Sequence, residues 1–168
     1  MTRVDFYVLP DSAGEARLAY ACRIAEKAYT QKHRVYLHAS SAAEAERLDA
    51  LLWMFRDTSF VPHALAGTVL PAADLPPVLI GHEDSHADGF LAAVEMGTFL
   101  ISPREIRNVP ISVLINLRDD VPAFHDRFAR VAEIVDADAG HRHRSRERFR
   151  TYRAHGCLLE THRLTAHG

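Results

Sequence analysis

Hydrophobic and polar positions in the first third of the chain alternate between strand-like and helix-like patterns. Residues 4–9 and 35–39 are rich in β-branched and aromatic side chains, which predicts two strands. Residues 13–31 and 41–54 carry apolar side chains three and four positions apart, which predicts two amphipathic helices. A β-α-β-α order favours a parallel sheet with helices packed on its faces.

The middle of the chain gives weaker patterns. Residues 59–63 form a short extended piece, and residues 78–81 are compatible with a strand. Residues 90–101 are apolar without a clear period, so helix and strand both remain open there. The number of strands in this part therefore stays open.

The last third returns to strong patterns. Residues 111–117 predict a buried strand, and the apolar spacing of residues 122–135, which open with a proline, predicts a helix. An arginine-rich helix is predicted over residues 142–155, with Gly140 breaking the chain before it and Gly156 ending it. We expect one α/β domain over residues 1–168, with a mostly parallel central sheet and helices on both faces.

Length and composition agree with this fold class. A chain of 168 residues with 48% hydrophobic and 25% charged residues is an ordinary globular domain. No apolar stretch approaches the roughly 20 residues that cross a bilayer, and the chain enters its first strand without room for a signal peptide. Cys22 and Cys157 have no motif spacing and fit a reducing compartment. We expect a cytoplasmic protein that makes no membrane contact.

Charge is segregated along the chain. The formal net charge of −2 argues against wholesale nucleic-acid binding. Of the 20 basic residues, however, only Lys27 and Lys32 are lysines, and six arginines lie between Arg142 and Arg153 with Glu147 as the single acid among them. This arginine-rich segment is the first indication of function.

Motifs for nucleotide or acyl chemistry are absent from the sequence. The eight glycines give neither GxGxxG nor GxxxxGK[ST], so no phosphate-binding loop is expected, and neither GxSxG nor CxxC occurs. We therefore expect no cofactor.

One cluster has the side chains of a metal site. Within residues 82–86 stand four possible ligands, which would suit a metal-dependent hydrolase: His82, Glu83, Asp84 and His86. A polar surface loop is the simpler explanation, because the chain holds 11 histidines and metal sites usually draw ligands from several elements. We expect no bound metal, and the hydrolase is the alternative function.

The arginine-rich helix is the most informative feature. Arg142, Arg146, Phe149 and Arg153 follow spacings of four, three and four, so they share one face. A solvated charged face is the ordinary explanation for such a run. Repulsion between arginines four apart, and the bidentate geometry of the guanidinium group, favour a carboxylate ligand instead. An acidic peptide that ends in a hydrophobic residue would fit a basic stripe around one aromatic ring; direct nucleic-acid binding is a third possibility.

Several segments resemble the chi subunit of bacterial DNA polymerase III holoenzyme. The resemblance lies in residues 5–9, in residues 36–53, in the string SFVPHALAG at 59–67, in VLINLR at 113–118 and in RERFRTYR at 146–153. It covers most of the chain outside residues 68–110, a segment longer than the family pattern. It implies a Rossmann-like three-layer α/β sandwich without nucleotide-binding machinery.

The resemblance also implies a function. Chi is a non-catalytic adaptor that connects the clamp loader, through the small psi subunit, to the acidic C-terminal tail of single-stranded DNA-binding protein. A repair helicase can replace psi, and DNA is met only indirectly.

Two sets of residues match the family's contact positions. The tail-binding pocket is expected at Arg142, Arg146, Phe149, Tyr152 and Arg153, with Arg146 on the terminal carboxylate of the tail and Phe149 at a position where the family often has tyrosine.

The surface that faces psi or a helicase is expected at Trp53, Phe60 and Val61. Core packing is the alternative explanation for these three side chains.

Overall fold

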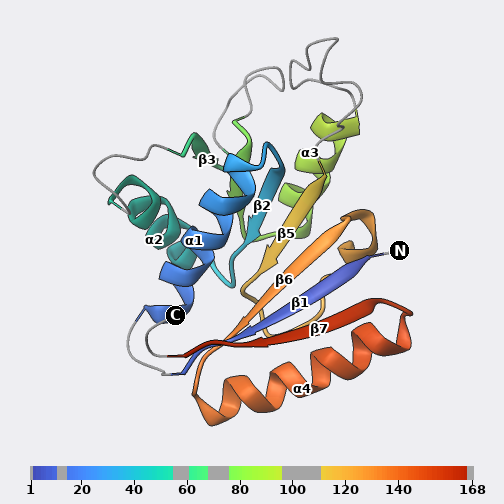
Figure 1. The fold of residues 1–168 in the computed structure, drawn as a ribbon. Helices are drawn as coiled ribbons and strands as arrows, with labels where there is room; N and C mark the ends of the chain where they lie inside the picture. The colour runs from blue at the N-terminus through green and yellow to red at the C-terminus, as the bar shows by residue number, and fades with distance from the viewer. Residues whose placement is uncertain (1, 11–14, 55–60, 68–75, 96–110, 166–168) are drawn as a thin grey trace.

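A computed structural model describes residues 2–10, 15–54, 61–67, 76–95 and 111–165 (Figure 1). Within them the chain builds one seven-stranded sheet in the order β3-β4-β2-β5-β6-β1-β7, and every pairing is parallel. The strands are β1 (Arg3–Val8), β2 (Arg34–His38), β3 (His63–Leu65), β4 (Val78–Gly81), β5 (Ser112–Asn116), β6 (Arg130–Val135) and β7 (Leu158–Arg163).

Helices cover both faces of this sheet. Two helices pack on one face, α1 (Ala16–Thr30) and α2 (Ala42–Met54). Two pack on the other, α3 (Asp84–Glu95) and α4 (Ala139–Ala154). The predicted parallel α/β sandwich is confirmed (Figure 1). Among the described helices, none combines the length and the apolar character that a bilayer crossing requires.

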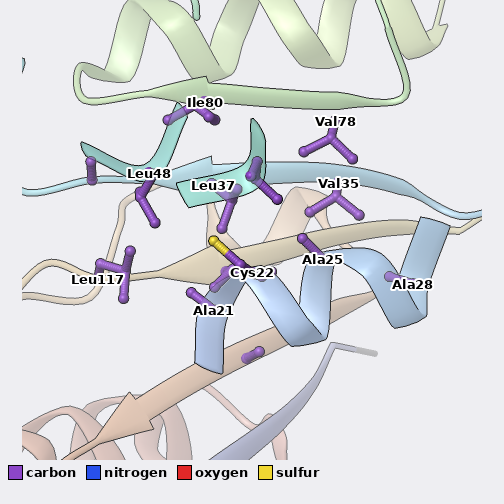
Figure 2. Close-up of a cluster of buried hydrophobic side chains, with 14 of the residues drawn as sticks. Ala21, Cys22, Ala25, Ala28, Val35, Leu37, Leu48, Val78, Ile80 and Leu117 are labelled. Atoms are coloured by element: carbon purple, nitrogen blue, oxygen red, sulfur yellow. The ribbon is translucent and has the colours of Figure 1, made fainter. Parts of the chain in front are cut away.

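The core under α1 and α2 combines small helix residues with branched strand residues. Figure 2 shows Cys22 and Ala25 of α1 directed at Leu37 and Val35 of β2. Alanines at the contact let the helix lie close to the sheet, while the branched side chains of the strands fill the space between the layers. The thiol of Cys22 is buried, and burial raises its pKa to about 12, so it serves as an apolar core atom.

The prediction of a helix over residues 122–135 is wrong. Only a single 3-10 turn forms, at His125–Arg127, and residues 130–135 are the strand β6 between β5 and β1. Five of the six β6 residues are buried, so the segment lacks the polar alternation that identifies a strand. Its apolar residues also fit a helical period by chance, and only long-range pairing decides between the two.

Other expectations at the ends of elements have mixed outcomes. Residues 78–81, which are compatible with a strand, form β4. In the segment 90–101, where helix and strand both remained open, residues 90–95 are the last part of helix α3. The rest of that segment lies outside the described residues. Gly140 does not break the chain, because α4 already begins at Ala139. The edge strand β7 was not predicted.

Candidate functional site

Helix α4 has well-defined ends. The Asp138 carboxylate caps its start by accepting a hydrogen bond from the His141 amide at 2.9 Å, which holds the pKa of Asp138 below its usual value. At the other end Gly156 adopts a φ of +80°, a conformation that glycine takes without strain, and the chain turns into β7. Helix α4 thus connects β6 to β7, the two strands that flank β1 in the sheet.

A buried polar network fixes α4 on the sheet. Glu133 of β6 is fully buried and accepts hydrogen bonds from Arg148 Nε at 3.0 Å and from the Tyr152 hydroxyl at 2.7 Å. The Asn116 side chain donates a third at 2.8 Å, and Arg148 also donates to the Asp119 carbonyl at 3.0 Å. Since Arg148 and Tyr152 are one helical turn apart, they hold α4 at a fixed height and rotation.

Burial shifts the pKa values of two members of this network, Glu133 and Tyr152. Burial raises the pKa of Glu133, although the positive charge of Arg148 and the hydrogen bonds oppose the shift. Burial and the neighbouring carboxylate raise the pKa of Tyr152 well above its ordinary value, so its hydroxyl keeps the proton that it donates.

The anchoring of α4 leaves a cleft beside it, which we call the arginine cleft. Its volume is about 240 Å³, and α4 forms one wall while the ends of β1, β6 and β7 form the other. It is lined by Phe6, Val8, Val135, Arg142, Ser145, Arg146, Phe149, Thr161 and Arg163. The ring of Phe149 is half-buried against Phe6, with 5.4 Å between the ring centroids. The cleft therefore has an apolar floor.

Cations surround this floor. Arg142, Arg146 and Arg163 line the cleft, and all three are exposed. Within the described residues the side chains of Arg146 and Arg163 have no carboxylate partner, whereas Arg142 Nε donates to the Asp136 carbonyl at 3.3 Å. Unpaired guanidinium groups beside an apolar slot can bind a carboxylate attached to a hydrophobic side chain.

The residues predicted for the tail pocket divide into two groups. Arg142, Arg146 and Phe149 do meet in one cleft. Tyr152 does not, because its ring is 0% exposed and faces the Glu133 network; its assignment to the pocket is wrong. Arg153 is exposed one turn further along α4, outside the cleft lining.

Sequence reasoning missed the contribution of β7. Thr161 and Arg163 alternate along this strand and line the cleft opposite α4. The parallel register places Arg163 beside Val8 and Thr161 beside Phe6. An alternating polar edge strand gives a weak local signal, so only the pairing with β1 identifies these two residues.

The second predicted surface lies at the other edge of the sheet. Trp53 is 61% exposed at the end of α2, which contradicts core packing, and Met54 beside it is exposed as well. The Trp53 ring rests on His63 of β3 with 4.9 Å between centroids. Val61 is 2% exposed and belongs to the core, so its assignment to a contact surface is wrong. Phe60 lies outside the described residues.

The four residues considered as metal ligands lie at the turn from β4 into α3. His86 Nδ1 accepts a hydrogen bond from the His82 amide at 3.2 Å. The Glu83 carboxylate stands 3.7 Å from His82 Nε2 and 3.9 Å from His86 Nε2. Among the described residues, neither these three side chains nor Asp84 belong to a group of three or more possible ligands whose ligand atoms all lie within 4.8 Å of one another.

One group in the described chain does converge, namely Asp5, Glu160 and His162. Arg3 and Arg130 already occupy the Asp5 carboxylate, each at 3.2 Å. Although burial raises it, hydrogen bonds from His162, Arg3 and Arg130 hold the pKa of Asp5 below its usual value. These side chains therefore form a neutralised ion-pair cluster.

The family model and the known proteins that this chain resembles all carry the same description. Residues 1–160 match the family model described as "DNA polymerase III chi subunit, HolC". A protein of Pseudomonas aeruginosa named "DNA polymerase III subunit chi" is 40% identical over 164 residues, which cover 98% of each chain. Proteins of the same name from Escherichia coli and Haemophilus influenzae are 27% and 26% identical over 165 and 158 residues, covering 96% and 94% of this chain and 97% and 94% of their own.

Proposed function

The chain belongs to the chi subunit family of DNA polymerase III, a non-catalytic accessory subunit in DNA replication, and we propose that its arginine cleft binds the acidic C-terminal tail of single-stranded DNA-binding protein. In this proposal the protein works in the cytoplasm and connects that tail to the clamp loader through a second partner. In this arrangement the single-stranded DNA-binding protein contacts the DNA, and this chain contacts that protein's tail.

One observation carries the proposal. Two guanidinium groups without a carboxylate partner in the described chain flank a half-buried phenyl ring inside a cleft. A peptide that ends in a hydrophobic residue can place its side chain on Phe149 and its terminal carboxylate between Arg146 and Arg163. Acidic residues upstream would approach Arg142 and the exposed Arg153.

Calorimetric titration with an acidic peptide that ends in phenylalanine tests the proposal. Charge-assisted hydrogen bonds to a carboxylate contribute about 1.5–3 kcal/mol each, so we expect micromolar affinity that weakens as salt rises. The same peptide with an amidated C-terminus is the matched control and should bind at least about tenfold more weakly. Equal affinity of the two peptides would contradict the proposed role of the cleft.

We further propose that the exposed patch of Trp53 and Met54 receives the psi subunit, or a repair helicase in its place. The patch is supported by two large apolar side chains more than half exposed at one helix end. The Trp53 ring contacts His63, whose Nδ1 donates to the Val61 carbonyl at 2.7 Å and whose Nε2 lies 3.1 Å from the Asp49 carboxylate.

Replacement of Trp53 by alanine is expected to weaken psi binding by at least about tenfold, because a central exposed tryptophan is a typical binding hot spot. The stability of the free protein should change by no more than about 0.5 kcal/mol, since the ring is exposed. Pull-down and calorimetry with purified psi measure the first, and urea unfolding the second. Leu158→Ala, at an equally exposed apolar residue on the opposite sheet edge, is the control. If both variants bind psi as the parent does, psi docks elsewhere.

A further inference from the structure

The sheet has an open area on the face opposite α4. Helix α1 packs on β2, β5 and β6, and in the described chain no helix continues beyond it over β1 and β7 (Figure 1). Side chains at alternate positions of β1 and β7 point to this open face, because Phe6 between them belongs to the core under α4. We call it the β1–β7 platform, and its strand residues are Arg3, Asp5, Tyr7, Leu158, Glu160 and His162.

Aromatic rings occupy its centre. Tyr7 and His162 are register partners on neighbouring strands, and their rings stack with 5.0 Å between centroids and an interplanar angle of 17°. Tyr20 of α1 approaches Tyr7 at 5.6 Å, and the Arg23 guanidinium lies 5.8 Å from the Tyr20 ring centroid. All three rings are partly exposed. They form an aromatic row that runs from the sheet edge to α1.

Two hollows adjoin this row. One has a volume of about 110 Å³ and reaches Arg130 and His33; the other, of about 380 Å³, reaches Arg23. Tyr7 and Lys27 line both, so the two hollows are neighbours along α1.

The charged groups around the row have a small excess of positive charge. The cations are Arg3, Arg23, Lys27 and Arg130, against the carboxylates of Asp5, Glu26 and Glu160. Asp5 is 2% exposed and lies beneath the cations that neutralise it. Since Asp5 and Glu160 already pair with Arg3 and Arg130, the excess positive charge lies at Arg23 and Lys27 of α1, against the single carboxylate of Glu26.

We propose that the β1–β7 platform binds single-stranded DNA directly. Unpaired bases stack on exposed aromatic rings regardless of sequence, and phosphates follow adjacent cations. The row of Tyr20, Tyr7 and His162 supplies the stacking surfaces, while Lys27 and Arg23 on α1 lie where a strand crossing the row would place its phosphates. The platform is on the other face of the sheet from the arginine cleft, so it goes beyond the proposed function: the protein could hold a protein tail and the DNA beside it at once.

Fluorescence anisotropy with a labelled oligothymidylate of about 15 nucleotides, at about 50 mM salt, tests the proposal in the full chain. We expect weak, salt-sensitive binding. Tyr20→Ala should raise Kd by about fivefold or more, the loss of one base stack. Lys27→Ala should raise it several-fold and lower the slope of log Kd against log salt by about one, the loss of one phosphate contact. Lys27 is exposed, so this variant should fold normally.

Arg150→Ala is the charge-matched control, since it removes an exposed arginine outside both the platform and the arginine cleft. It should leave DNA binding unchanged, and Tyr20→Ala and Lys27→Ala should leave binding of the acidic peptide unchanged. Absence of oligonucleotide binding at low salt overturns the proposal. So does binding that is lost in Arg146→Ala but kept in Tyr20→Ala and Lys27→Ala, which would place the DNA on the arginine cleft. Peptide binding measured on the same samples shows separately whether the proposed function holds.

Discussion

Replacement of Arg146 by alanine is expected to weaken binding of an acidic, phenylalanine-terminated peptide by about ten- to a hundredfold. Arg146 lines the arginine cleft next to Phe149, and no carboxylate of the described chain satisfies it. The hydrogen bonds that Arg146 would donate to the peptide exist only in the complex. The substitution therefore costs the free protein no ion pair, and the whole loss should appear as a higher Kd. Isothermal calorimetry on the parent and the variant measures it.

Arg150→Ala is again the matched control. It lowers the net charge by the same amount on the same helix but removes no cleft residue, so its effect on Kd should be less than about threefold. Lysine at position 146 should restore only part of the affinity, because an ammonium group lacks the planar fork of guanidinium. If Arg146→Ala and Arg150→Ala weaken binding equally, the peptide senses only the general charge of α4, and the cleft is not the site.

Replacement of Arg148 by methionine is expected to lower the free energy of unfolding by about 3–5 kcal/mol, although it removes one of six arginines on a largely exposed helix. Arg148 is 5% exposed, and its loss leaves the fully buried Glu133 carboxylate without its cation. Urea unfolding at neutral pH measures the change. Arg150→Met, an exposed position on the same helix, should stay within about 0.5 kcal/mol of the parent.

A double variant separates the charge from the packing. With Glu133→Gln added to Arg148→Met, no buried charge remains, and the amide oxygen of position 133 can still accept from Tyr152 and Asn116. The double variant should therefore be more stable than Arg148→Met alone. If it is less stable, or if Arg148→Met is as stable as the parent, the Glu133 network does not anchor α4.

Helix α4 shows how far sequence reasoning reached at the site. Its existence and the shared face of Arg142, Arg146 and Phe149 follow from helical spacing, which is a local property. Its buried stripe consists of Ser145, Arg148 and Tyr152, one of them charged. Two of these three side chains are polar, so the buried stripe gives no hydrophobic pattern in the sequence. Arg148 can be buried because its charge is neutralised by Glu133, fifteen positions earlier. The wrong assignment of Tyr152 to the surface follows from that long-range pairing.

The difference between local sequence patterns and long-range pairing also explains which other elements could be predicted. The strands β1, β2 and β5 and the helices α1 and α2 carry their pattern within their own residues and were predicted. Strand β6 is buried between β5 and β1, and β7 is an edge strand added beside β1. Neither is determined locally: one lacks alternation, and the other is largely polar. Arg163 in the arginine cleft and His162 in the β1–β7 platform are placed only by the pairing of β7 with β1.

A double-mutant cycle between Arg146→Ala and amidation of the peptide C-terminus tests most directly whether the arginine cleft recognises a terminal carboxylate. Calorimetric Kd values for the four combinations give the coupling between the two groups. If Arg146 grips the carboxylate, each change alone weakens binding strongly and the second adds little, which corresponds to a coupling of about 1.5–3 kcal/mol. Effects that simply add, within about 0.5 kcal/mol, would show that the two groups do not meet and would contradict this assignment of the cleft.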